Sequence, residues 1–126
     1  MSVKFNVIER GKPGDPQAPK KFYPSIVATG KRSQREVAVS AAKLSALEPA
    51  DMAAAVENFL SVITDELSRG NIVDLGEFGS FWLRVETEGA DKEGDVNAAS
   101  IQAVRMRFTP GKAFQEMLDK ITFEKA

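Results

Sequence analysis

The sequence predicts an α+β fold with the element order strand, strand, helix, helix, strand, strand, strand, helix. Short segments in which apolar and polar residues alternate are typical of strands with one buried face. Longer segments carry apolar residues at helical spacing, and clusters of glycine and proline separate the segments. With 126 residues, of which 43% are hydrophobic, the composition is that of an ordinary folded domain.

The first two strands are expected near the N-terminus. Val3, Phe5 and Val7 alternate with polar residues, and a loop rich in glycine and proline follows. Residues 22–28 form the second expected strand, and Pro24 confines it to a sheet edge because proline has no backbone N–H to donate. The pattern leaves open whether the two strands form a hairpin or add to another sheet.

Two helices are expected next. The first begins at Ser33, which has capping-box spacing to Glu36, and is expected to end near Ser45. Pro49 suits the first residue of the second helix, and Gly70 is placed to end it. This second helix carries a broad apolar stripe, which indicates a core or dimer surface rather than a ligand site. The stripe consists of Met52, Val56, Phe59, Leu60, Ile63 and Leu67.

Three further strands are expected. The first two, at residues 71–75 and 80–85, form a hairpin around a glycine-rich turn at residues 76–79, whose glycines are expected to supply positive φ angles. Side-chain parity places Phe81 on a buried face, and Trp82 and Arg84 on the opposite one. The third of these strands covers residues 104–108, with two arginines facing outward. The final helix follows Pro110-Gly111, and its expected inner stripe is Phe114, Leu118 and Ile121.

Composition argues against several classes of function. The chain has no cysteine and no histidine, so it lacks a disulfide, a thiolate and the usual general base. Asp65 and Glu66 are typical of a solvated helix face rather than of a metal site. No segment approaches the roughly 18 apolar residues that span a bilayer. We therefore expect a soluble, cytoplasmic protein that is not an enzyme and has no cofactor, metal, small-molecule substrate or membrane contact.

The charges are divided unevenly along the chain. Residues 1–35 hold eight basic and two acidic residues and sum to +6, whereas the overall charge is −1, so the remainder sums to −7. Such a split favours a polyanionic partner, with a solvated flexible tail as the alternative.

Three motifs then occur in order. They are Gly70–Val73, Gly76–Phe81 with Arg84 after it, and Phe108–Ala113. Together with the element order, they resemble the bacterial histone-like HU and integration host factor superfamily over roughly residues 30–123. The N-terminal strands are similar to those of the divergent HU-like (HIG-type) branch. The expected organisation is a basic N-terminal β extension at residues 1–30 and an HU-like DNA-binding domain at residues 31–126.

This resemblance implies a nucleoid-associated homodimer whose helices form a body and whose two sheets form a saddle on DNA, each extending a β-arm. Large aromatic side chains in short strands agree with this, because a lone subunit would not easily cover them, although an ordinary monomer core is the alternative. The expected dimer core is Phe59, Phe78, Phe81 and Phe108.

DNA would be held mainly through its phosphates, so binding would depend on salt and little on sequence. The alternative for the arginines is that they keep an exposed sheet face soluble. The residues expected to contact DNA are Arg84, Arg105, Arg107, Lys112, Lys20, Lys21, Lys31, Arg32 and Arg35.

The expected arm departs from the superfamily pattern. Residues 86–97 contain five acids and one lysine, and no proline lies between Phe81 and Pro110. The proline wedge that kinks DNA therefore has no counterpart, and we expect reduced or no bending. An alternative is that the acidic arms dock on basic N-terminal segments, so that the chain is a scaffold or protein-interaction module that has lost DNA binding. The sequence leaves open DNA or RNA, any sequence preference, and pairing with a different chain.

Overall fold

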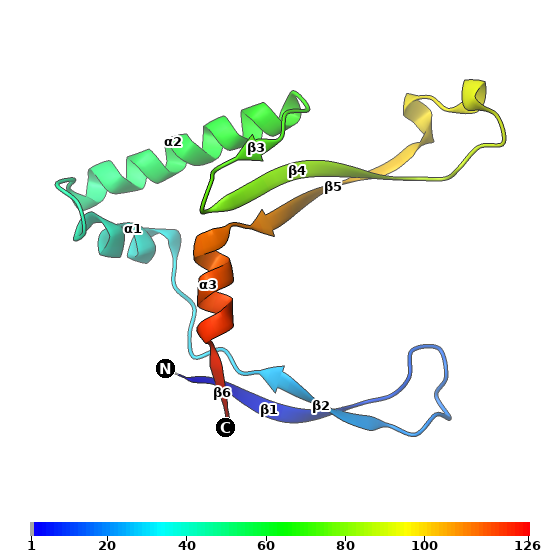
Figure 1. Ribbon diagram of the computed structural model, residues 1–126, viewed down its shortest axis with the longest axis horizontal. Coiled ribbons are helices and arrows are strands. Elements are labelled where there is room, and N and C mark those ends of the chain that lie inside the picture. The colour runs from blue at the N-terminus through cyan, green and yellow to red at the C-terminus, as the bar shows by residue number, and fades with distance from the viewer. Residues whose placement is uncertain (1) are drawn as a thin grey trace. The chain divides into compact units, whose positions relative to one another are not determined.

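The computed structural model describes residues 2–126 and has an α+β fold (Figure 1). It contains three α-helices, two three-stranded sheets and two 3₁₀ helices that the sequence analysis did not predict. The chain divides into two compact units. One comprises residues 2–33 together with 117–126, and the other comprises residues 34–116.

The first unit is built on a sheet with the strand order β2-β1-β6. Its strands are β1 (Ser2–Arg10), β2 (Lys21–Ile26) and β6 (Thr122–Lys125). The first two pair antiparallel, so the predicted N-terminal strands form a hairpin, and Pro24 lies on the edge strand as predicted.

Strand β6 was not predicted, and it pairs parallel with β1. A 3.0 Å ion pair between Lys4 Nζ and Glu124 Oε2 and a 2.9 Å hydrogen bond from the Ala126 N–H to the Phe5 carbonyl link the two strands. The two ends of the chain therefore meet in one sheet.

The second unit contains α1 (Gln34–Ala42) and α2 (Pro49–Ser68). Helix α1 ends three residues before the predicted Ser45, whose N–H instead closes a tighter turn onto the Ala42 carbonyl. Helix α2 begins at Pro49, as predicted. Gly70, with φ of +85°, donates its N–H to Leu67, and the next N–H reaches Glu66, so a Schellman motif ends the helix.

Three antiparallel strands in the order β3-β4-β5 complete this unit. They are β3 (Val73–Asp74), β4 (Gly79–Thr87) and β5 (Ile101–Pro110). Phe81 lies opposite Phe108, and Leu83 lies opposite Met106. Because side chains alternate along a strand, this register confirms the predicted apolar face and leaves the arginines on the other.

The motifs at Gly76–Phe81 and Phe108–Ala113 are hydrogen-bonded to each other. The Gly111 N–H donates to the Phe78 carbonyl at 3.1 Å, and the Ala113 N–H donates to the Glu77 carbonyl at 3.2 Å. A Cβ atom on Gly111 would lie 2.4 Å from the Glu77 carbonyl oxygen, so only glycine permits this approach. The turn at residues 76–79 is thus fixed against the start of α3 (Lys112–Lys120).

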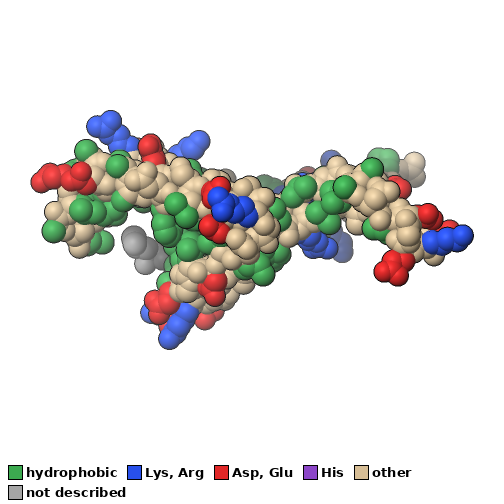
Figure 2. All heavy atoms as spheres, turned by 90° about the horizontal axis from the view of Figure 1, so that it is seen from above, with side chains coloured by type: hydrophobic (Ala, Val, Ile, Leu, Met, Phe, Trp, Pro, Cys, Tyr) green, Lys and Arg blue, Asp and Glu red, His purple; other side chains and the backbone are tan. Residues whose placement is uncertain are grey.

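Very few apolar side chains of a single chain are buried. Within residues 2–126 the fully buried apolar residues are Ala38, Ala42 and Leu67. Figure 2 shows hydrophobic side chains exposed over much of the visible surface. The α2 stripe illustrates this, because Phe59 is 52% exposed and Leu60 is 55% exposed.

Four phenylalanines gather between the sheet and α3 in the second unit. Their rings lie with centroids 4.7 to 6.2 Å apart, yet the Phe78 side chain remains 47% exposed. The members of this cluster are Phe78, Phe81, Phe108 and Phe114.

The stripe predicted for the last helix needs correction. Phe114 is half-buried as expected, but Leu118 is 52% exposed, and Ile121 lies after the end of the helix. No helix within residues 2–126 is both long and apolar enough to cross a bilayer.

Candidate nucleic-acid interface

The face of the β4–β5 pair opposite the phenylalanines carries the outward arginines. Arg84 lies directly opposite Arg105, and Trp82 lies opposite Arg107. All three arginines line one shallow hollow of about 350 Å³, which Glu86 and Gln102 also border. The structure therefore brings together Arg84, Arg105 and Arg107 in one place, on the face that the parity of the strands predicted.

The charges in this hollow are only partly balanced. Like charges directly opposite each other on a sheet repel, and Arg84 and Arg105 are such a pair. The Arg105 Nε–H donates to Glu86 Oε1, an ion pair between half-exposed side chains. In the part of the chain that the structure describes, neither Arg84 nor Arg107 has an acidic partner. The hollow is therefore positive, with Glu86 as its internal counter-charge.

Glu86 is a part of this surface that was not predicted, whereas strand parity placed Trp82 on the same face as Arg84, as the register confirms. Residues 82, 84 and 86 share one face of β4, so the same alternation that predicted Arg84 would have placed Glu86 beside it. The prediction instead counted Glu86 among the acids of the arm. The partner of Trp82 could not be foreseen, because it depends on the register between β4 and β5.

The strands beyond the hollow continue into a loop at residues 88–100. Gln102 is an extra residue in β5, because Glu86 pairs with Ala103 whereas Thr87 pairs with Ile101, and such a bulge bends a strand pair. The loop contains 3₁₀ helices at Glu93–Asp95 and Ala98–Ser100. Its acidic side chains at positions 88, 91, 93 and 95 are exposed.

Side-chain hydrogen bonds hold the base of this loop. The Thr87 hydroxyl donates to the Ser100 carbonyl at 2.7 Å, and Asn97 caps the second 3₁₀ helix by accepting the Ala99 N–H at 2.9 Å. The tip is thus a defined acidic structure rather than an unstructured excursion.

Lys112 occupies the first turn of α3 but does not line the arginine hollow. Free N–H groups at a helix start would support phosphate binding. The Ala113 N–H is instead bonded to the Glu77 carbonyl, which leaves fewer donors for a ligand. The Lys112 ammonium lies 4.0 Å from the Glu116 carboxylate, and both side chains are largely exposed.

The remaining predicted basic residues are spread over both units. Lys20 and Lys21 belong to the β1–β2 hairpin, and Lys31 and Arg32 follow β2 in the same unit. Arg35 lies on α1 in the other unit, where it lines a groove with Glu48 and Glu57. Four of these five residues therefore belong to the first unit and one belongs to the second.

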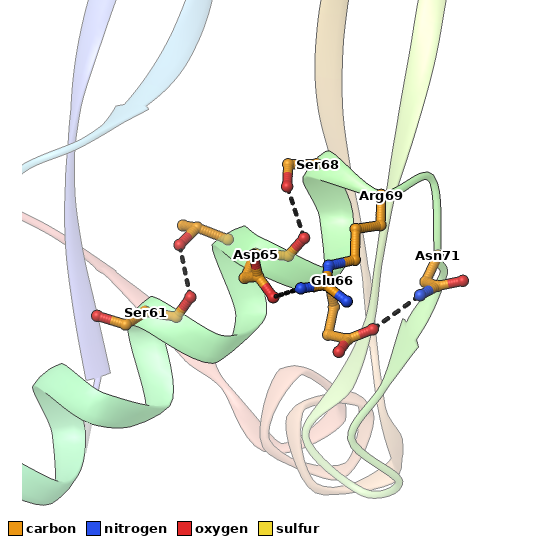
Figure 3. A network of polar contacts seen from close by, with 7 residues as sticks. Ser61, Asp65, Glu66, Ser68, Arg69 and Asn71 are labelled. Carbon is orange, nitrogen blue, oxygen red and sulfur yellow. Dashed lines mark hydrogen bonds and ion pairs between the residues drawn. The ribbon is translucent and has the colours of Figure 1, made fainter.

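The acidic pair on α2 stabilises the end of that helix (Figure 3). Asp65 Oδ2 lies 3.1 Å from Arg69 Nη2, and Glu66 Oε2 accepts a 2.7 Å hydrogen bond from the Asn71 side chain. The Ser68 hydroxyl donates to the Asp65 carbonyl at 2.6 Å. Among the described residues, no three potential ligands gather where they could hold a metal ion.

Comparison with known proteins gives a family and a structural neighbour. A family model described as "HU domain fused to wHTH, Ig, or Glycine-rich motif" matches residues 1–125. A crystal structure described as a "Putative bacterial DNA binding protein" from Bacteroides vulgatus ATCC 8482 is similar in fold, with a TM-score of 0.66 and 17% sequence identity. The match covers 98% of this chain and 48% of the other, so this chain spans about half the length of that protein. No curated protein matches the sequence.

Proposed function

The chain belongs to the HU-HIG family of HU domains fused to wHTH, Ig or glycine-rich motifs, and from this premise we propose that it binds duplex DNA as a histone-like, nucleoid-associated protein. A basic extension at residues 1–30 and an HU-like domain at residues 31–126 would share this task. We propose no catalytic activity or cofactor for it.

One observation carries the proposal: three arginines line a single hollow on the outer face of β4 and β5. Guanidinium groups bind phosphate oxygens through paired hydrogen bonds, and an anion would relieve the repulsion between Arg84 and Arg105. Such contacts follow the DNA backbone rather than the bases, so binding is expected to be nearly independent of sequence.

The proposed DNA-binding form is a homodimer with the HU arrangement. Its support is the exposed apolar surface of the single chain, including the α2 stripe and the phenylalanine cluster. Each large apolar side chain that becomes fully buried contributes about 1.5 to 3 kcal/mol, which gives a second copy a strong reason to bind. The proposed dimer core is Phe59, Phe78, Phe81 and Phe108.

The arm is proposed to bend DNA weakly or not at all. Its tip presents exposed acids, which are repelled by phosphates, and residues 82–109 contain no proline to wedge between base pairs. The DNA would then lie on the arginine surface while the arm tips stay clear of the phosphates.

Fluorescence anisotropy with a labelled duplex of random sequence tests the proposal. Binding is expected at low salt and should weaken steeply by about 200 mM salt, because phosphate contacts release counterions. Arg84→Gln and Arg107→Gln should each weaken binding to all sequences alike. Arg69→Gln is the matched control, since it removes the same charge from the end of α2. Absence of binding at low salt would refute the proposal.

The acidic arm tip favours a second candidate, an HU-like scaffold or protein-interaction module without DNA binding. In that case, deletion of residues 1–30 would change self-association, measured by analytical ultracentrifugation, and the duplex would not bind at any salt concentration. A parallel titration with duplex RNA would separate DNA binding from general polyanion binding.

A further inference from the structure

The hairpin formed by β1 and β2 has a basic hollow of its own at its tip. This hollow measures about 640 Å³ and lies wholly within the first unit. Its charged and aromatic lining comprises Arg10, Lys12, Lys21, Tyr23 and Asp15. Arg10 and Lys12 were not among the residues predicted to bind DNA.

Two cations of this hollow face each other across the strand pair. Arg10 and Lys21 lie directly opposite each other in the β1–β2 register, so their like charges repel. In the described part of the chain, no ion pair joins Arg10, Lys12 or Lys21 to an acid.

Asp15, the one acid in the lining, has a structural role in the loop. Its Oδ1 accepts the Gln17 N–H at 3.0 Å, and its own N–H donates to the Lys12 carbonyl at 3.1 Å. The turn that Asp15 organises holds Lys12 near the end of the strand pair. A bound anion would therefore meet three cations on a fixed hairpin.

An aromatic ring completes the hollow. Tyr23 lines it and remains 43% exposed, and Lys21 and Arg10 share its side of the sheet because the register pairs Ile8 with Tyr23. Basic side chains next to an exposed ring are suited to a phosphodiester and its sugar, since the ring offers an apolar surface that inorganic phosphate does not need.

We propose that the β1–β2 hairpin is a second nucleic-acid contact, in which Arg10, Lys12 and Lys21 hold a phosphodiester and Tyr23 packs against the adjoining sugar. The inference rests on the proposed function, because it names a further contact for the same ligand. The positive charge that the β4–β5 loop lacks is then supplied by a different hairpin.

The triple variant Arg10→Gln, Lys12→Gln, Lys21→Gln tests this site by anisotropy with the random duplex. Its matched control is Lys43→Gln, Lys120→Gln, Lys125→Gln, which removes the same charge from exposed lysines elsewhere. The hairpin variant is expected to bind about tenfold more weakly than the control, with a salt slope smaller by about two to three. Equal affinity and slope for the two variants would overturn the inference.

Amide chemical shifts of the unmodified chain during titration with the duplex separate this inference from the proposed function. We expect shifts at residues 10–23 as well as at the arginine hollow of β4 and β5. Shifts at the sheet alone would overturn the hairpin site and leave DNA binding intact, and shifts at the hairpin alone would overturn the sheet site instead. No shifts at either would overturn both.

A further measurement without DNA identifies a competing occupant, the acidic arm of a second copy. In the variant Asp91→Asn, Glu93→Gln, Asp95→Asn, the hairpin amides should keep their positions. A change in the hairpin amides would mean that the arm occupies the hollow, and the nucleic-acid site would be wrong.

Discussion

Gly79 lies at a position where the backbone conformation and the neighbouring atoms leave no room for a side chain. Its φ is +132°, and a Cβ atom there would lie 2.3 Å from the Thr109 carbonyl oxygen and 2.7 Å from the Phe108 ring. Gly79→Ala should therefore destabilise the fold by roughly 3 kcal/mol, through backbone strain and overpacking together.

Chemical denaturation at fixed protein concentration measures this loss. Gly94→Ala is the control, because nothing lies within 4 Å of a Cβ atom at that position. If both variants unfolded at the same denaturant concentration, the close contact between the turn at residues 76–79 and the end of β5 would not be essential to the fold.

Glu86 is predicted to restrain DNA binding. It neutralises part of the Arg105 charge at the edge of the arginine hollow. Glu86→Gln should raise affinity for the random duplex about threefold at low salt, because it frees a cation and removes a repulsive carboxylate.

Anisotropy measures the gain, with Asp119→Asn on α3 as the variant of equal charge change. A gain of the same size in the control would assign the effect to net charge rather than to the hollow.

At the scale of elements, the acidic loop between β4 and β5 is expected to affect DNA binding and DNA bending differently. Neutralising its tip with Asp91→Asn, Glu93→Gln, Asp95→Asn should strengthen DNA binding, because repulsion of the phosphates falls. Bending should stay absent, since the loop still has no proline wedge. Energy transfer between dyes at the two ends of a duplex measures the bend.

The control for the loop neutralises Asp51 and Asp65 on α2 and Asp119 on α3, which changes the net charge equally. Strong bending by either the natural chain or the loop variant would contradict the proposed role of the arm.

The strands themselves were predictable to different degrees. Alternation in residues 104–108 was enough to place β5 and the outward arginines. Strand β6 has four exposed residues directly after a helix, and its pairing with β1 joins the two ends of the chain. The sequence of residues 122–125 does not predict this pairing, because the pairing depends on how the rest of the chain folds between β1 and β6.

At the scale of the whole molecule, the main feature is that a single chain buries very few apolar side chains. Phe59 and Leu60 of the α2 stripe and Phe78 of the phenylalanine cluster are each about half exposed in one chain. We predict a dimer of twice 13.7 kDa, measured by light scattering after size exclusion. Phe59→Glu should give monomers with reduced helix content, because a charge would have to be buried in the interface.

Ser61→Glu is the control for the dimer, since it places the same charge on an exposed polar position of α2. A Phe59→Glu chain that remained fully dimeric would place the interface elsewhere.

The sequence alone determined the fold class, the turns that require glycine, the second helix and the apolar and polar faces of β4 and β5. These follow from side-chain periodicity and from φ angles that only glycine adopts readily, both of which are local properties. It also determined the family, through motifs around Gly76 and Phe108.

Only the tertiary structure decided that these motifs contact each other, that Glu86 pairs with Arg105, and that Arg10 faces Lys21 across a hairpin. Each of these depends on strand register or on contacts between distant segments, which periodicity does not specify. The electrostatic character of each surface therefore became visible only when the pairing of the strands was known.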